Sequence, residues 1–211
     1  MTGPINLFPV DRYWFLTWTT YGTWLPGDDR GYVGMAPDRD GRLVMHNLPN
    51  TPPAPPNPRL RRDAEASLKR TPVVLDITEA ESLLEQFHET ANHRRWLLQA
   101  VGIMHTHLHL VVGVPGDPDP DKVLGDFKAY GSRRLNQISG GPQGVSPRTA
   151  SPTPRWTTGG SKRKLTGESS ITAAIRYIRD QPNPLLIWTR EDGITFSARN
   201  PAPPGQHARM D

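Results

Sequence analysis

The chain has 211 residues, a formal net charge of +4 and only 35% hydrophobic residues, beside 23 prolines and 19 glycines. This length allows one domain with its own core, and the Pro and Gly content places much of the chain in loops. The absence of cysteine excludes disulfides and thiolate metal sites. Because the first residues lack a signal-peptide pattern and no segment approaches the roughly 20 apolar residues of a membrane span, we expect a soluble, cytoplasmic protein with no membrane partner.

Aromatic and β-branched residues predict a first strand over 13–20. Alternation places Trp14, Leu16 and Trp18 on one of its faces. The other face carries Tyr13, Phe15 and Thr17. A long insertion follows at about 26–75, and its six prolines between 49 and 58 predict an extended surface segment.

The insertion ends in an apolar stretch at 72–76 that predicts a short strand, and a helix follows it. Thr78 is the expected N-cap, because Glu81 stands three residues later. The helical spacing of the apolar residues predicts an end near 93–95. The predicted buried face consists of Leu83, Leu84, Phe87 and Ala91.

Two further strands, 96–103 and 107–114, are separated by so few residues that they predict an antiparallel hairpin. Alternation puts His107 and His109 on one face of the second strand. Two polar rings on an apolar strand cost free energy unless something pairs with them, so we interpret them as ligands of one divalent ion. The competing interpretation is a pair of surface or hydrogen-bonded histidines. His105 falls in the hairpin turn and is the least suited to bind a metal.

A helix is predicted over 119–138, a Gly/Pro/Ser/Thr-rich loop over 139–161, and a last short helix over 169–181 that Pro182 ends. The inward residues expected of the first of these helices are Val123, Phe127, Tyr130 and Leu135. On the last helix Tyr177 and Gln181 are four residues apart and share a face. Residues 185–198 predict a hairpin that turns at Asp192-Gly193, and we expect disorder after it.

This order of elements predicts an α+β fold, an antiparallel sheet with helices on one face and the other face open to a ligand. We expect one domain over 1–182, interrupted by the Pro-rich insertion, and a C-terminal tail over 183–211.

At this point the sequence resembles the HUH-superfamily single-tyrosine transposases, which include the REP-associated tyrosine transposases. "MHTHLHLVV" is similar to the family's His-hydrophobic-His strand: Met104 keeps its place, while His105 and Thr106 replace the usual Pro-Asn. "FKAYGSRRLNQ" resembles the family's basic helix, and Tyr177 precedes Gln181 by the family's four residues. The resemblance implies the ferredoxin/RRM-like HUH fold and covers the first strand and about 78–182.

The resemblance also implies a function. The family cleaves single-stranded DNA by tyrosine attack on a phosphodiester and rejoins it, as in DNA transposition. Tyr177 would be the nucleophile and would form a 5′-phosphotyrosine intermediate. His107, His109 and Gln181 would hold Mg²⁺ or Mn²⁺, and imidazole ligands favour Mn²⁺.

The expected partner is single-stranded or hairpin DNA, which suits a mildly basic chain. Two basic clusters are candidate phosphate contacts, and each is equally well interpreted as a solvated face: Lys128, Arg133 and Arg134, and Lys162, Arg163 and Lys164. Trp24 and Trp156, beside turns, are candidates to stack on unpaired bases.

Of three alternatives, the first two remain at this stage. A catalytically inactive regulator of the same fold would bind DNA hairpins, and a replication initiator or relaxase-like nickase would share the metal motif. A barrel hydrolase with a His-x-His strand end needs about 250 residues and many strand-helix repeats, which this chain lacks. The sequence leaves both a monomer and a homodimer open, and with them a tyrosine acting in its own site or in the partner's.

Overall fold

The computed structural model describes residues 9–29, 34–37, 40, 42–46, 55–139 and 154–199. Its centre is a six-stranded antiparallel sheet with strand order β6-β1-β5-β4-β7-β8. The strands are β1 (Arg12–Thr19), β4 (Leu97–Ile103), β5 (His107–Val114), β6 (Ser161–Leu165), β7 (Leu186–Thr189) and β8 (Gly193–Ser197). The predicted antiparallel α+β sheet is confirmed. No helix in the described ranges is long and apolar enough to cross a membrane.

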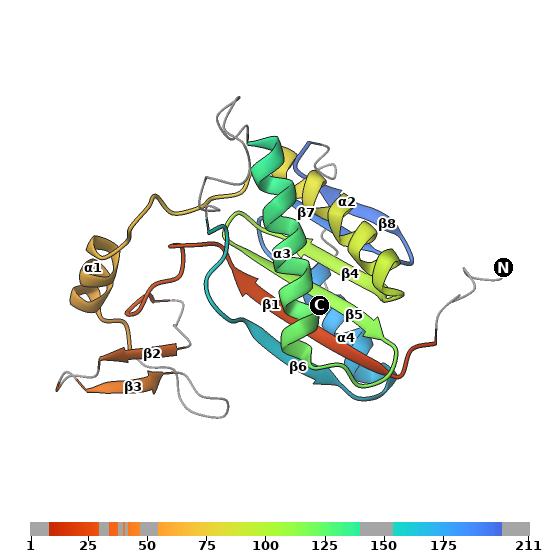
Figure 1. Ribbon diagram of the computed structural model, residues 1–211, viewed down its shortest axis with the longest axis horizontal. Helices are drawn as coiled ribbons and strands as arrows, with labels where there is room; N and C mark the ends of the chain where they lie inside the picture. Colours follow the sequence, from red (N-terminus) through yellow and green to blue (C-terminus); the bar gives the residue numbers. More distant parts are fainter. Residues whose placement is uncertain are drawn as a thin grey trace, which may run out of the picture.

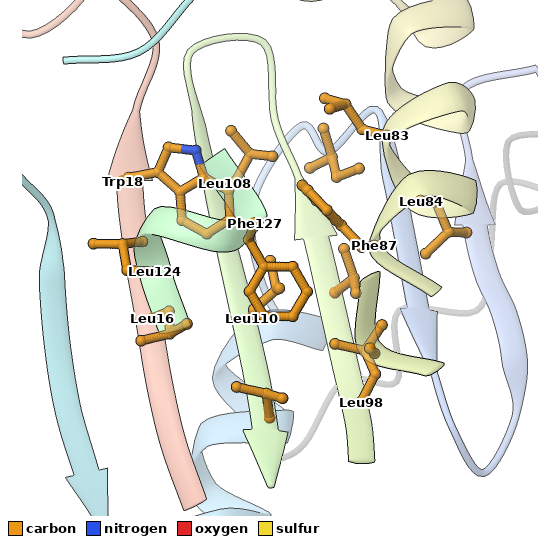
Figure 2. Close-up of a cluster of buried hydrophobic side chains, with 14 of the residues drawn as sticks. Leu16, Trp18, Leu83, Leu84, Phe87, Leu98, Leu108, Leu110, Leu124 and Phe127 are labelled. Carbon is orange, nitrogen blue, oxygen red and sulfur yellow. The ribbon is translucent and has the colours of Figure 1, made fainter. Parts of the chain in front are cut away.

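Helices α2 (Ile77–Arg94) and α3 (Pro120–Ile138) lie side by side on one face of the sheet (Figure 1). Between them and the sheet lies the main core, where Trp18 and Phe87 meet edge to face and Leu110 is completely buried (Figure 2). The predicted buried face of the first strand is confirmed. Its three members alternate along β1, so each points into the same layer.

The N-cap of helix α2 lies two residues before the predicted one. Asp76 is the N-cap: its Oδ1 accepts from the Glu79 amide at 2.8 Å, and Glu79 Oε2 accepts from the Asp76 amide at 3.2 Å. The Thr78 and Glu81 prediction was wrong because an equivalent capping box stands two positions upstream. The strand predicted at 72–76 is also absent. Its backbone is extended, but only Val73 and Leu75 donate single hydrogen bonds, to Tyr21 and His105.

Helix α4 (Gly167–Arg179) lies on the opposite face of the sheet, behind it in Figure 1. Its buried residues Ala174 and Ile178 pack in a second, smaller cluster that includes Val111. Gly102 permits this close approach, because a Cβ there would lie 2.9 Å from Ile178 Cγ2. The expectation that all helices share one face therefore needs correction: α4 covers part of the face that was expected to be open.

Two local predictions in the second half of the chain also change. The basic residues 161–165 form edge strand β6 beside β1, although the pattern had indicated a loop leading into a basic cluster. On α3, Tyr130 is only half-buried, and Gly131 faces the core in its place. A Cβ on Gly131 would lie 3.1 Å from Leu83, so the glycine allows α2 and α3 to pack closely.

The predicted C-terminal hairpin exists, and it turns at Asp192-Gly193. Its strand β7 pairs with β4, so the hairpin extends the main sheet and the boundary expected at residue 182 does not separate it from the domain. The disorder expected after residue 199 falls outside the described residues.

The insertion forms β2 (Gly34–Pro37) and β3 (Leu43–His46), an antiparallel pair, and helix α1 (Pro58–Ala66). These elements lie beyond the end of β1, to one side of the main sheet (Figure 1). Most of the proline-rich stretch falls outside the described residues. Its last proline, Pro58, opens α1 behind the N-cap Asn57, a position where proline loses no helical hydrogen bond.

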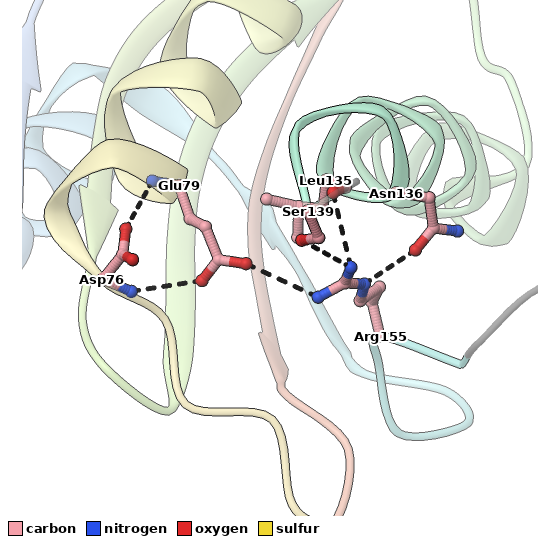
Figure 3. Close-up of polar contacts among 6 residues, drawn as sticks. All are labelled: Asp76, Glu79, Leu135, Asn136, Ser139 and Arg155. Atoms are coloured by element: carbon pink, nitrogen blue, oxygen red, sulfur yellow. Dashed lines mark hydrogen bonds and ion pairs between the residues drawn. The ribbon is translucent and has the colours of Figure 1, made fainter. Parts of the chain in front are cut away.

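Arg155 ties α2 to the end of α3 (Figure 3). Its Nη2 donates to Ser139 Oγ at 2.8 Å, its Nε donates to Asn136 Oδ1 at 2.8 Å, and its Nη1 lies 3.5 Å from Glu79 Oε1. Glu79 thus takes part in both the capping box of α2 and this contact. The segment that leads into β6 is thereby fixed against two helices.

Candidate active site

His107 and His109 lie on the face of β5 that faces away from α2 and α3. Their ring centroids are 5.1 Å apart and the rings are nearly perpendicular, at 80°. In the antiparallel pair they stand opposite Thr19 and Thr17 of β1. The alternation of the strand therefore brings the two imidazoles together, as the sequence predicts.

His109 is buried and held in a fixed orientation. Its Nδ1 shares a hydrogen bond of 2.7 Å with Thr17 Oγ1, and Phe15 stacks on its ring at 5.5 Å. Burial lowers its pKa to about 3, the charge of His107 adds to this effect, and the nearby Gln181 side chain opposes it. At neutral pH His109 is thus a neutral imidazole, the form that binds metals.

Tyr177 comes to the same place from α4, and Gln181 follows from the segment just after it, because the helix ends at Arg179 and not at residue 181 as predicted. The Tyr177 ring lies 5.3 Å from the His109 ring and 5.7 Å from Phe15, with half of the residue exposed. Gln181 Nε2 donates to the Tyr177 carbonyl at 3.1 Å, which leaves the amide oxygen of Gln181 to accept other contacts. All four residues named for the reaction therefore meet within one chain.

The residues fit a divalent metal. His109 Nε2 is buried and makes no hydrogen bond within ordinary geometry, which is costly unless something pairs with it. Thr17, on its other nitrogen, is the kind of outer partner that orients a metal-binding imidazole. No group of three or more His, Cys, Asp or Glu side chains suited to a metal occurs in the described parts of the chain. The Gln181 side chain lies near His109 and is the candidate for a third protein ligand. A set of two nitrogens and one oxygen suits Mn²⁺ or Mg²⁺.

Only one residue of the basic cluster on β6 faces this site. Arg163 stands opposite Phe15 in the β1–β6 pair, and its Cζ lies 5.2 Å from the Phe15 ring centroid. Lys162 lies on the opposite face, where its Nζ pairs with Asp121 of α3 at 2.6 Å. Lys164 alternates in the same way and is exposed. The structure brings Arg163 to the site and directs the two lysines away from it.

The basic cluster of α3 lies on the other side of the sheet. Lys128 Nζ donates to the carbonyls of Thr157 and Gly159 at 2.6 and 2.7 Å, and burial together with the charge of Lys162 lowers its pKa to about 8. Arg134 pairs with Glu85 at 2.6 Å. Lys128 and Arg134 therefore make contacts within the fold, on the side of the sheet away from the histidines, and their contact with DNA stays a prediction. Arg133 is exposed and lies over the Tyr130 ring, away from the histidines.

The two tryptophans expected to stack on bases differ. Trp24 is half-buried, with its ring centroid 5.5 Å from that of His107, at the edge of the site. Trp156 is only 8% exposed, meets Trp18 edge to face and donates from Nε1 to the Lys128 carbonyl at 2.8 Å. Its rings are occupied by the core, so the expectation of base stacking by Trp156 is corrected.

Phe15 and Thr17 belong to the site although they were not among the predicted site residues. Their signal was present, because alternation along β1 separates them from Trp14, Leu16 and Trp18. What was missing was the knowledge that β1 pairs with β5 in the register that sets Thr17 opposite His109.

The family described as "Transposase IS200 like" matches residues 67–181, which is more than half of the chain. No curated protein matches. Among solved structures, one of a REP-associated tyrosine transposase bound to a REP hairpin is similar at 12% identity and a TM-score of 0.41, over 84% of this chain and 70% of that one. A structure of a transposase-like protein from Deinococcus radiodurans R1 is similar at 17% identity and a TM-score of 0.39, over 87% and 98%.

Proposed function

This chain belongs to the IS200-like transposase family, and from that premise we propose that it cleaves and rejoins single-stranded DNA through a covalent bond between Tyr177 and a 5′ phosphate. The observation that carries this proposal is the contact of the half-exposed Tyr177 ring with the buried, neutral His109. It brings a nucleophile that DNA can reach to the residues that fit a metal.

His107, His109 and Gln181 would hold the ion, Mg²⁺ or Mn²⁺. When bound, it would polarise the phosphoryl oxygens of the DNA and neutralise the charge that develops on them. Thr17 keeps the His109 ring in one orientation, and the hydrogen bond to the Tyr177 carbonyl keeps the Gln181 amide near the ring. These contacts are formed before any substrate arrives.

Tyr177 would act as the nucleophile. Its Oη loses its proton and forms a bond to phosphorus, while the bond from phosphorus to the 3′ oxygen breaks and that oxygen leaves as a hydroxyl. The products are a 5′-phosphotyrosine and a free 3′-OH. Attack by a 3′-OH on the same phosphorus reverses the step, so the strand can be rejoined without an outside energy source.

The partner we propose is unpaired DNA, either a single strand or the unpaired part of a hairpin. An unpaired strand can turn a phosphodiester toward side chains on the sheet. Because Tyr177 meets His109 of its own chain, we propose that one chain holds a complete site and needs no partner subunit for the cleavage step.

The test uses end-labelled stem-loop oligonucleotides of varied sequence, incubated with the full chain and Mn²⁺. Denaturing gels should show a shortened strand and a protein–DNA adduct, and mass spectrometry should place the nucleotide on Tyr177. Tyr177→Phe should still bind DNA but form no adduct. Tyr130→Phe is the matched control and should keep full activity, because Tyr130 lies on α3 across the sheet.

Three outcomes would contradict the proposal: an adduct on Tyr130, full cleavage by Tyr177→Phe, or cleavage that leaves no covalent adduct. DNA binding by the unaltered protein without any cleavage would instead favour an inactive hairpin-binding regulator of the same fold.

A further inference from the structure

The insertion is attached to the end of the sheet that carries His107. Trp24, at the start of this region, contacts His107, and the chain returns beside it at the insertion's end. There the Val73 amide donates to the Tyr21 carbonyl at 2.9 Å, and the Leu75 amide donates to the His105 carbonyl at 2.8 Å. The segments on both sides of α1 are therefore fixed next to the candidate active site.

The start of helix α1 packs against Gly27, in the loop that follows Trp24. The Asn57 amide donates to the Gly27 carbonyl at 3.1 Å. A Cβ on Gly27 would lie 2.3 Å from the Asn57 carbonyl oxygen, and the φ of +85° disfavours any other residue. The first turn of α1 thus lies directly against the loop that leads from Trp24.

Helix α1 has no buried residue. It is held by its caps, since Asn57 Oδ1 accepts from the Leu60 amide at 3.1 Å and Ser67 closes the other end. Only Leu60 and Ala64 are half-buried, so the helix gains little free energy from burial within its own fold. The outer surface of α1 is thus available to a partner.

The available charge on this surface is positive. Five exposed cations lie on α1 and just after it, here called the α1 cation cluster: Arg59, Arg61, Arg62, Lys69 and Arg70. No ion pair found among the described residues involves any of them, although Asp63 and Glu65 are close in sequence. Helical spacing places Arg59 and Arg62 together, on the side opposite the half-buried Leu60 and Ala64.

We propose that the α1 cation cluster binds the phosphodiester backbone of the single strand that runs into the active site. Charge complementarity identifies the partner, because five exposed cations with few acids between them suit a polyanion and recognise no particular base. Helix α1 begins against Gly27, in the same loop as Trp24, and Trp24 contacts His107 at the edge of the site. The inference rests on the proposed function, since it assumes that the strand passes His107.

The experiment measures oligonucleotide affinity at a series of salt concentrations. All variants carry Tyr177→Phe, so that no cleavage alters the probe, which is a stem-loop with single-stranded flanks of varied length. The test variant is Arg59→Gln/Arg62→Gln, and Arg59→Lys/Arg62→Lys retains the charge. The matched control, Arg95→Gln/Lys122→Gln, removes two exposed cations at the opposite end of the sheet, before β4 and after β5.

Loss of two phosphate contacts should make the slope of log affinity against log salt shallower by about 1.4, at roughly 0.7 per contact on a single strand. The Lys variant and the control should keep the original slope. The affinity gained by lengthening one flank should also be smaller in the Gln variant, which keeps three of the five cations. Circular dichroism should show that the fold is retained, because neither arginine is buried.

An unchanged slope in the Gln variant, or an equal reduction in the control, would overturn the inference. The adduct assay in the chain that retains Tyr177 distinguishes the two proposals. An adduct on Tyr177 with an unchanged slope would refute the role of the cluster alone. A slope reduced only in the Gln variant, without any adduct, would support the cluster and refute the proposed chemistry.

Discussion

The two faces of β5 have different functions. Leu108, Leu110 and Val112 are fully buried under α2 and α3. On the opposite face, α4 covers only part of the strand, and the histidines lie beside a tyrosine that remains half exposed. If the proposed function is correct, adjacent residues of one strand serve stability and chemistry in alternation, and substitutions at neighbouring positions should have effects of different kinds.

The largest effect should come from the site face, with His109→Ala. We expect loss of metal-dependent DNA cleavage below detection, because a proposed ligand is removed, together with a moderate loss of stability, because the Thr17 hydrogen bond and the Phe15 contact are lost too. Cleavage gels and thermal melting measure the two effects. Unchanged Mn²⁺ affinity of His107→Ala/His109→Ala in calorimetry would contradict the ligand assignment.

The adjacent residue should behave in the opposite way. Leu110→Ala removes a fully buried side chain from the core and should lower the free energy of unfolding by about 2–5 kcal/mol. The molecules that remain folded should cleave DNA normally. Denaturant titration combined with cleavage rates per folded molecule tests this. A large loss of activity in fully folded Leu110→Ala would show that the two faces are coupled.

A smaller effect is expected on the opposite strand, with Thr17→Val. This nearly isosteric change removes the hydrogen bond to His109 Nδ1, and outer partners of metal-binding histidines typically contribute about 10- to 100-fold to metal affinity. Calorimetric Mn²⁺ titration measures it. Thr19→Val is the control, since Thr19 bonds Thr157 and does not bond a histidine. Equal losses in both variants would indicate general damage to β1.

The smallest expected effect compares the two sides of β6. Arg163→Gln should weaken binding of single-stranded DNA by about fivefold, the scale of one exposed charged contact, because Arg163 lies beside Phe15 on the site face. Lys164→Gln, with the same loss of charge on the other face, should have little effect. Fluorescence anisotropy at fixed salt measures both. Equal weakening of DNA binding by Arg163→Gln and Lys164→Gln would mean that DNA does not bind preferentially to the site face of β6.

The sequence was sufficient to predict which site residues lie close together when they are near each other along the chain. Alternation put His107 and His109 together, because that relation depends only on local geometry. Gln181 does lie near Tyr177, as the four-residue spacing predicts, but it follows the end of α4 at Arg179 and does not share a helix face with Tyr177. The hairpin of 96–103 with 107–114 also followed from the short connection between them. Joining the histidines to the tyrosine required the family resemblance.

Relations between distant segments could not be predicted. Strand β6 was missed because only Leu165 among its five residues is buried, so no alternating pattern marks it as a strand. The side of the sheet that α4 occupies depends on Gly102 opposite Ile178, a contact between residues 76 positions apart. Trp156 was misassigned because it follows a turn-rich stretch, although its ring reaches the core.

The Arg155 contact has a practical consequence for protein engineering. The Arg155 guanidinium bonds Ser139 and also contacts Asn136 and Glu79. These contacts hold the two ends of the segment 140–153 close to each other. A reporter, an affinity handle or new chain termini introduced between these points would not have to span any gap.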